Sequence, residues 1–261
     1  MTHQKLTVLA VGKLTNVALA VKKEPSIIPN IRLVWLGSNY PEPGEYNQEN
    51  DIESLNFLLS TDITFEMVTV RYGKLSGTDF VKVTEDDVQK RIAPLGETIA
   101  TPVTGRHGGE YFSFGAYAIS LFDNTSYFGD PPSRSLFDMA AVAIVKNPSW
   151  AKAKEIPSPI LIDKKWVEIP ENNRKIVLWE YFNQKSILND FYEQSQDLRK
   201  VDGISYTSLF ETVLSDFVIR EKYQEKPKLA IFGPLEGRLS EFDRIITVSY
   251  THLTLPTNRE V

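Results

Sequence analysis

The sequence predicts an α/β fold in which an open, mostly parallel sheet carries helices on both faces. Three observations lead to this prediction. Apolar runs of strand length alternate with amphipathic runs of helical length, the connections between them are short, and the 261-residue chain is 42% hydrophobic. Strands and helices that alternate over short connections favour parallel strands joined by crossover helices, and this apolar content is enough for a substantial core.

The amino-terminal part predicts the order β-α-β-α-β. The expected elements are strands at 6–11, 31–36 and 65–70 and helices at 14–22 and 52–59. Pro25 follows the first helix and closes it. Asn50 and Glu53 have the spacing of a capping box, so we expect Asn50 to cap the second helix.

The rest of the first 195 residues is less regular. Residues 96–109 predict a loop rich in Thr, Pro and Gly. The other expected elements are helices at 85–92, 111–122, 138–145 and 186–194 and strands at 160–162, 166–169 and 175–179, some of them in a hairpin.

Composition also divides the chain. We expect residues 1–195 to form one incomplete α/β domain, because the first strand has the apolar character of an interior strand. Residues 196–203 are polar and linker-like, residues 204–247 predict an unrelated segment with a helix and a strand, and residues 248–261 predict a disordered, artefactual tail.

Charge and residue usage exclude several classes of protein. The net charge of −5 argues against a general nucleic-acid binder, which is usually basic. The absence of cysteine excludes disulfides and thiolate chemistry. No apolar run is long enough to span a membrane, and the first residues lack the pattern of a signal peptide. We therefore expect a small-molecule ligand and neither a nucleic-acid nor a membrane partner.

The polar loop at 37–51 is the first candidate site, because it follows an expected parallel strand, and ligands bind at the carboxyl ends of such strands. Glu45 and Asn47 are two residues apart, so in an extended backbone both side chains face the same way. A carboxylate beside an amide can hold a vicinal diol. The alternative is a solvated loop whose polar side chains only satisfy backbone groups.

Asp138 is the second candidate, because it opens an apolar helix. It is either an N-cap or a ligand of a hard divalent cation. One carboxylate cannot complete a calcium site, so the second interpretation requires ligands from elsewhere in the protein.

His107 is the third candidate. It is the only histidine that we expect in the fold interior, and its near-neutral pKa suits acid–base chemistry. A structural role is the alternative. The aromatic residues that follow predict either core packing or rings that stack on a base. They are Tyr111, Phe112, Phe114 and Tyr117.

Three segments together resemble the inosine-uridine preferring nucleoside hydrolase family. Residues 11–20 resemble its GPLTN segment, Glu45-Tyr46-Asn47 with Asp51 resembles its EFN…D segment, and residues 137–142 resemble its HDPLAV segment. The resemblance covers residues 5–194. It implies a Rossmann-like fold and hydrolysis of the N-glycosidic bond of ribonucleosides to ribose and free base, with bound Ca²⁺.

The resemblance also implies roles for individual residues. Asp138 and the backbone carbonyl of Val11 would ligate the calcium, while Glu45, Asn47 and Asn39 would hold ribose hydroxyls. A homo-oligomer is possible for the intact parent. We expect a cytoplasmic protein, unless a signal peptide lies in the missing amino-terminal part.

Two departures from the family matter. Phe137 replaces the histidine that protonates the leaving base in some members, so His107 or Tyr117 would take that role. The Asp-rich DTDxGxDD segment, which supplies most of the calcium carboxylates, has no counterpart. We therefore expect a truncated, inactive chain. The alternative is a non-catalytic nucleoside- or sugar-binding relic.

The carboxyl-terminal part resembles other sequences. Residues 204–246 are similar to a piece of the B subunit of bacterial helicase–nuclease enzymes of double-strand break repair, and residues 248–261 resemble translated sequencing adapter. These resemblances imply a chimeric translation, with a natural fusion as the alternative.

Overall fold

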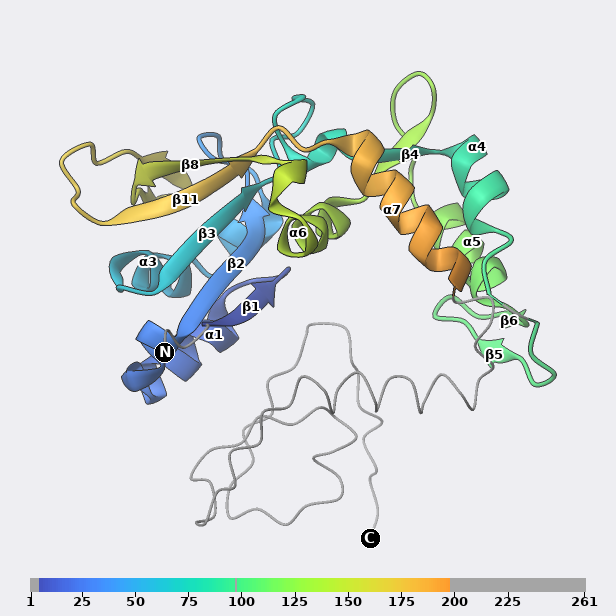
Figure 1. Cartoon of the computed structure of the whole chain (residues 1–261), viewed down its shortest axis with the longest axis horizontal. Coiled ribbons are helices and arrows are strands. Elements are labelled where there is room, and N and C mark those ends of the chain that lie inside the picture. Colours follow the sequence, from blue (N-terminus) through green and yellow to red (C-terminus); the bar gives the residue numbers. More distant parts are fainter. Residues whose placement is uncertain (1–4, 97, 198–261) are drawn as a thin grey trace, which may run out of the picture. The chain divides into compact units, whose positions relative to one another are not determined.

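The computed structural model of the chain describes residues 5–96 and 98–197, and it confirms the α/β fold with a mostly parallel sheet (Figure 1). The five strands of the main sheet have the order β1-β2-β3-β11-β8, and every neighbouring pair is parallel except β11 with β8. The strands are β1 (Leu6–Ala10), β2 (Ile31–Ser38), β3 (Thr64–Thr69), β11 (Lys175–Glu180) and β8 (Lys152–Pro157).

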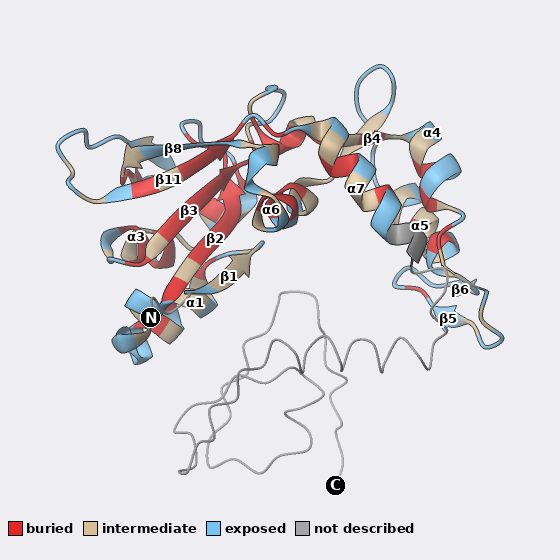
Figure 2. Cartoon of the chain, in the orientation of Figure 1, coloured by how far each residue is buried: buried red, intermediate tan, exposed pale blue. Residues whose placement is uncertain are grey.

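Helices cover both faces of this sheet. Because strand side chains alternate between the faces, neighbouring residues of one strand enter different cores. On β2, Leu33 and Trp35 pack with α1 (Thr15–Lys23) and α3 (Ile52–Ser60). Val34 and Leu36 pack on the other face with α6 (Phe137–Lys146) and α7 (Gln184–Asp197). Figure 2 shows the resulting continuous burial of β2 and β3. The near-continuous apolar run of β2 is therefore explained by two cores and not by one.

Shorter elements complete the described part of the chain. Three antiparallel pairs lie outside the main sheet: β4 (Lys82–Thr84) with β7 (Ser133–Ser135), β5 (Val103–Thr104) with β6 (Glu110–Tyr111), and β9 (Ile160–Ile162) with β10 (Lys165–Val167). The other elements are η1 (Pro25–Asn30), α2 (Tyr46–Asn50), η2 (Thr78–Phe80), α4 (Glu85–Asp87), the π-helical turn η3 (Val88–Ile92), α5 (Phe114–Asp123) and η4 (Pro148–Trp150).

Two expectations for individual elements are wrong, and one strand of the main sheet has no counterpart among them. The cap of α3 is Asp51, whose carboxylate accepts a hydrogen bond from the Ser54 N–H. Asn50 does not cap α3, because it is the last residue of α2. The helix expected from 111 begins only at Phe114, since Ser113 caps it and Tyr111 belongs to β6. The edge strand β8 was not expected, because its exposed lysines give no apolar pattern. Charged side chains of this kind protect a sheet edge from further pairing.

The carboxyl-terminal expectations fall almost entirely outside the described residues. Helix α7 continues to Asp197, so the first two residues of the expected linker at 196–203 are helical. The segments at 204–247 and 248–261 are not described. Among the helices that are described, none combines the length and the apolar composition needed to cross a bilayer.

Candidate functional site

The candidate site lies where the parallel strands end. Val11 follows β1, the loop with Glu45 follows β2, and Tyr72 lies in the turn after β3. The Val70 N–H donates to the Ser38 carbonyl at 2.6 Å, which holds the ends of β2 and β3 together. The carboxyl ends of parallel strands form the usual ligand-binding edge of an open α/β sheet.

Glu45 is the buried carboxylate of this edge, with only 4% of its surface exposed. It caps α2, because its Oε2 accepts a hydrogen bond from the Gln48 N–H at 2.7 Å. Burial raises the pKa of the Glu45 carboxyl. Hydrogen bonds from the backbone N–H groups of Gln48 and Asn47 oppose that rise, while the negative charges of Glu49 and Asp138 add to it. The charge of Asp138 thus acts on the Glu45 carboxyl.

Asp138 lies in the first turn of α6, at its positive amino-terminal end. The N-cap position belongs to Leu136, so the interpretation of Asp138 as a cap is wrong. Its side chain is accessible to solvent, yet the protein atoms around it raise the pKa of its carboxyl through desolvation. An accessible carboxylate near a buried one suits a polar, hydroxyl-rich ligand.

Tyr72 completes the site, and the sequence reasoning missed it. Its ring packs edge-to-face on that of Phe137, with 5.9 Å between the ring centroids. Phe137 is the residue directly before Asp138. Burial and the negative charges of Glu45 and Asp79 raise the pKa of Tyr72, and Arg134 opposes them. The signal in the sequence was available, because Tyr72 follows an expected strand end just as the loop of Glu45 does.

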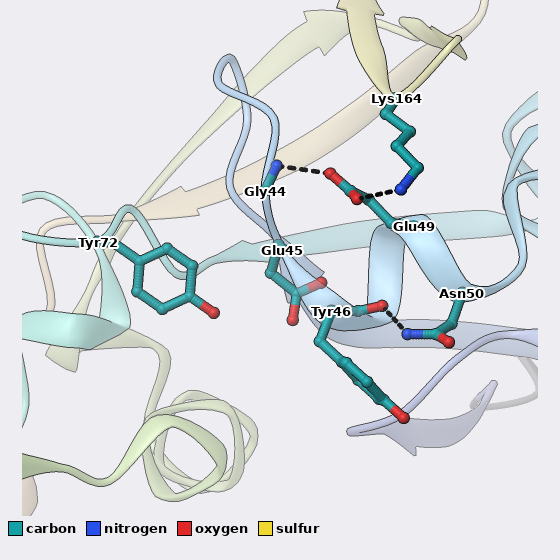
Figure 3. A pocket seen from close by; sticks show the side chains of 7 residues that line it. All are labelled: Gly44, Glu45, Tyr46, Glu49, Asn50, Tyr72 and Lys164. Atoms are coloured by element: carbon teal, nitrogen blue, oxygen red, sulfur yellow. Dashed lines mark hydrogen bonds and ion pairs between the residues drawn. The ribbon is translucent and has the colours of Figure 1, made fainter. Parts of the chain in front are cut away.

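A pocket of about 360 Å³ opens at this edge. It is lined by Gly44, Glu45, Tyr46, Glu49, Asn50, Tyr72 and Lys164. Figure 3 shows the Glu45 carboxylate lying between the rings of Tyr72 and Tyr46, while Glu49 turns away toward Lys164. Glu49 is held by Lys164 at 3.1 Å and by the Gly44 N–H at 2.8 Å (Figure 3). Glu45 is therefore the carboxylate of this pocket that points toward the aromatic rings.

Asn39 holds the loop together. Its Nδ2 donates to the Pro43 carbonyl at 2.7 Å, and its Oδ1 accepts from the Tyr72 N–H at 3.2 Å. It is almost fully buried. These contacts match the alternative in which loop side chains satisfy backbone groups, and they tie the β2 loop to the turn after β3.

Asn47 does not have the extended backbone that we expected. It lies within helix α2, so the alternation argument that placed it beside Glu45 is wrong. Its Nδ2 is 3.5 Å from the Leu36 carbonyl, at the end of β2. Its backbone N–H, however, faces the Glu45 carboxylate. A role for the Asn47 amide toward a ligand stays a prediction.

The two acid–base candidates lie elsewhere. His107 is exposed in the turn between β5 and β6, so its expected place in the interior is wrong. Tyr117 lies on α5, where its ring is 5.4 Å from that of Tyr111. Figure 1 places β5, β6 and α5 well apart from the carboxyl ends of β2 and β3. The structure therefore does not bring these two side chains to Glu45.

The donors for calcium are too few. Val11 places its backbone at the correct edge, immediately after β1, and Asp138 supplies one carboxylate. Within residues 5–96 and 98–197, no three acidic or histidine side chains gather in a group that could hold a metal ion. Calcium requires six to eight oxygen ligands, so this donor set does not fit it.

Fold and site together define an α/β protein with a polar and aromatic pocket at the carboxyl edge of its sheet. A profile of the inosine-uridine preferring nucleoside hydrolase family matches residues 1–199. The chain belongs to this family. No sequence among curated proteins matches it. Nothing in these comparisons supports the helicase–nuclease or adapter resemblances beyond residue 203.

Solved structures show the same fold. The inosine-uridine preferring nucleoside hydrolase of Bacillus anthracis is 19% identical, with a TM-score of 0.53 over 76% of this chain and 62% of that one. The purine-preferring ribonucleoside hydrolase of Gardnerella vaginalis is 20% identical, with a TM-score of 0.52 over 76% and 63%. A plant nucleoside hydrolase is 16% identical, with a TM-score of 0.56 over 73% and 61%. The chain thus spans less than two thirds of each relative.

Proposed function

We propose that the pocket around Glu45 binds the ribose of a nucleoside, and that the parent protein hydrolyses the N-glycosidic bond of ribonucleosides to ribose and free base. The observation that carries this proposal is the pocket at the carboxyl edge, in which the buried Glu45 carboxylate lies beside the Tyr72 ring. Asp138, on the first turn of α6, adds a second negative charge that acts on Glu45. Family membership supports the reaction class.

The carboxylate of Glu45 has the capacity for this role. An ionised carboxylate offers about four acceptor positions. Backbone N–H groups of Gln48 and Asn47 use part of this capacity and fix the orientation of the side chain. The remaining acceptor positions can take hydrogen bonds from two neighbouring hydroxyls, which is what a ribose diol presents.

Two negative side chains also suit the chemistry of glycosidic cleavage. When the bond to the base breaks, positive charge develops on the sugar ring, and preorganised negative groups stabilise that charge. Glu45 is fixed by its capping hydrogen bond, and Asp138 is fixed on the first turn of α6. Both carboxylates would therefore act by position, with little reorganisation.

We further propose that the chain as given binds nucleosides without turning them over. Family members depend on a metal ion, and the described donors do not fit calcium. Incubation with inosine or uridine and calcium should release no ribose above a blank. Steady release of ribose would contradict this part of the proposal.

Calorimetric titration with inosine tests the binding step. Glu45→Gln removes the charge but keeps the size of the side chain, and we expect it to weaken inosine binding by about tenfold, since hydrogen bonds to charged groups contribute about 1.5–3 kcal/mol. Glu53→Gln is the matched control, because Glu53 is exposed on α3 and lines no described pocket. Equal affinities for the wild type and both variants would refute the proposed site.

A further inference from the structure

We propose that Tyr72 contacts the nucleobase of the bound nucleoside, and that Phe137 and Arg71 are positioning residues that hold Tyr72 in place. This inference rests on the proposed function, because it assumes that the Glu45 end of the pocket takes the ribose. It assigns the aromatic side of the site to the other half of the ligand.

The chemistry of the pocket is asymmetric. Glu45 offers charged oxygen atoms to the pocket, whereas Tyr72 offers an aromatic ring. Tyr72 has 46% of its residue surface exposed. Figure 3 shows the Tyr72 ring beside the Glu45 carboxylate, with its hydroxyl end directed toward Glu45. A nucleoside has the same asymmetry, with hydroxyls on the sugar and a flat ring as the base. Aromatic faces and edges favour such rings.

Phe137 distinguishes Tyr72 from the other tyrosine of the pocket. The edge-to-face contact with Phe137 holds the Tyr72 ring next to the first turn of α6, where Asp138 lies. Tyr46 has 65% of its surface exposed and no ring contact with another described residue. Of the two rings that flank Glu45, only Tyr72 is therefore held by contact with another ring.

The backbone of Tyr72 is also fixed. Arg71 has a left-handed backbone with φ of 47°, which is strained for a residue other than glycine. Its guanidinium donates to the Tyr40 carbonyl at 2.9 Å and pairs with Glu180 at 2.7 Å. The N–H groups of Tyr72 and Gly73 donate to side chains of Asn39 and Asp79. The fold maintains this strain, and the result is a preformed position for the Tyr72 ring.

The phenol can also donate a hydrogen bond. A tyrosine hydroxyl keeps its proton at neutral pH, since its ordinary pKa is about 10. Burial, with the charges of Glu45 and Asp79, raises the pKa of Tyr72 further. Purine and pyrimidine bases carry nitrogen and oxygen acceptors at their edges. Tyr72 therefore combines ring contact with a directed hydrogen bond to the base.

Titrations of the full chain with inosine, ribose and hypoxanthine test this assignment. We expect Tyr72→Ala to weaken inosine and hypoxanthine binding about tenfold and to leave ribose binding unchanged. Tyr72→Phe should retain ribose binding and lose about threefold in affinity for inosine, since only the hydroxyl is removed. Tyr181→Ala is the matched control, because Tyr181 is similarly exposed, at 52%, and lines no described pocket.

The outcomes separate the inference from the proposed function. If Glu45→Gln weakens inosine binding but Tyr72→Ala and Tyr72→Phe do not, the assignment of Tyr72 is wrong and the ribose site stands. If Tyr72→Ala loses affinity equally for ribose and inosine, Tyr72 contacts the sugar and the assignment to the base is overturned. The assignment is also overturned if Tyr46→Ala, and not Tyr72→Ala, loses affinity for inosine. If Glu45→Gln changes nothing, the proposed function itself fails. Tyr72→Phe keeps the ring packing, so the test does not depend on whether Tyr72→Ala folds.

Discussion

Glu45 combines two roles that compete electrostatically. As the cap of α2 it accepts backbone hydrogen bonds, which favour the charged carboxylate, while its burial and the nearby charges of Glu49 and Asp138 favour the neutral acid. The second group of effects prevails, because the net shift of its pKa is upward. A buried carboxyl with a raised pKa in a pocket is a typical mark of a functional site.

This shift predicts how stability depends on pH. A carboxyl whose pKa is higher in the folded than in the unfolded state binds more protons when folded, so its charge destabilises the fold above the folded pKa and has no such effect below the unfolded pKa. We expect Glu45→Gln to raise the free energy of unfolding at about pH 7. The gain should shrink towards pH 4, near the ordinary glutamate pKa of about 4.3.

Urea unfolding at both pH values measures this difference. The Glu53→Gln control should change stability by less than about 0.5 kcal/mol, as is usual for an exposed position. A difference between wild type and Glu45→Gln that is the same at both pH values would show that charge at Glu45 has no part in it.

At the scale of secondary structure, the junction between α2 and α3 shows how one side chain ends one helix and starts the next. Asp51 follows the last residue of α2 and caps α3, and Thr15 on α1 donates to its other oxygen. Burial alone would raise the pKa of Asp51, but hydrogen bonds from Thr15 and Ser54 outweigh it and the pKa is lowered. Asp51 therefore ties α1 to α3 on one face of the sheet.

We predict that Asp51→Ala lowers the free energy of unfolding by about 1–2 kcal/mol, the usual cost of losing such a cap. Asn50→Ala is the neighbouring control and should cost less than about 0.5 kcal/mol. Because the pKa of Asp51 is depressed on folding, its contribution should be lost as the pH falls through that lowered value. Equal costs for the two variants at neutral pH would restore Asn50 as the cap.

The turn after β3 is held by an ion pair between Arg71 in the turn and Glu180 at the end of β11. Arg71 and Glu180 are both nearly buried, and Lys154 on β8 gives Glu180 a second partner at 3.1 Å. We expect Arg71→Ala to destabilise the fold by about 1–3 kcal/mol, because it leaves a buried carboxylate with one partner fewer.

Thermal or urea unfolding of Arg71→Ala and of Lys90→Ala checks this expectation. Lys90 pairs with Asp86 on an exposed surface, so its loss should cost less than about 0.5 kcal/mol. If both variants unfold alike, the ion pair at Arg71 does not hold this turn.

At the scale of the molecule, the parallel half of the fold is predictable because β1, α1, β2, α3 and β3 alternate along the sequence with little interruption. Edge strand β8 is not predictable from the sequence, since its exposed Lys152 and Lys154 leave it without an apolar pattern. The residues around the site are only partly predictable. Glu45 and Asp138 are separated by more than ninety positions, so their approach depends on the topology and not on spacing.

The same reason explains the errors at the site. His107 was selected for its chemistry, but its hairpin lies apart from the carboxyl edge. Tyr72 was overlooked because its contact with Phe137 joins two segments that are distant in sequence. Residue type alone selects candidates, whereas the order of the strands decides which of them meet.

Amide hydrogen exchange of the full chain, with and without saturating inosine, tests the central claim most directly. Binding at the carboxyl edge should slow exchange at residues 44–50, in the turn around Tyr72 and in the first turn of α6. Slowed exchange confined to the hairpin around His107, or no change anywhere along the carboxyl edge, would contradict the claim that Glu45, Tyr72 and Asp138 form a nucleoside site.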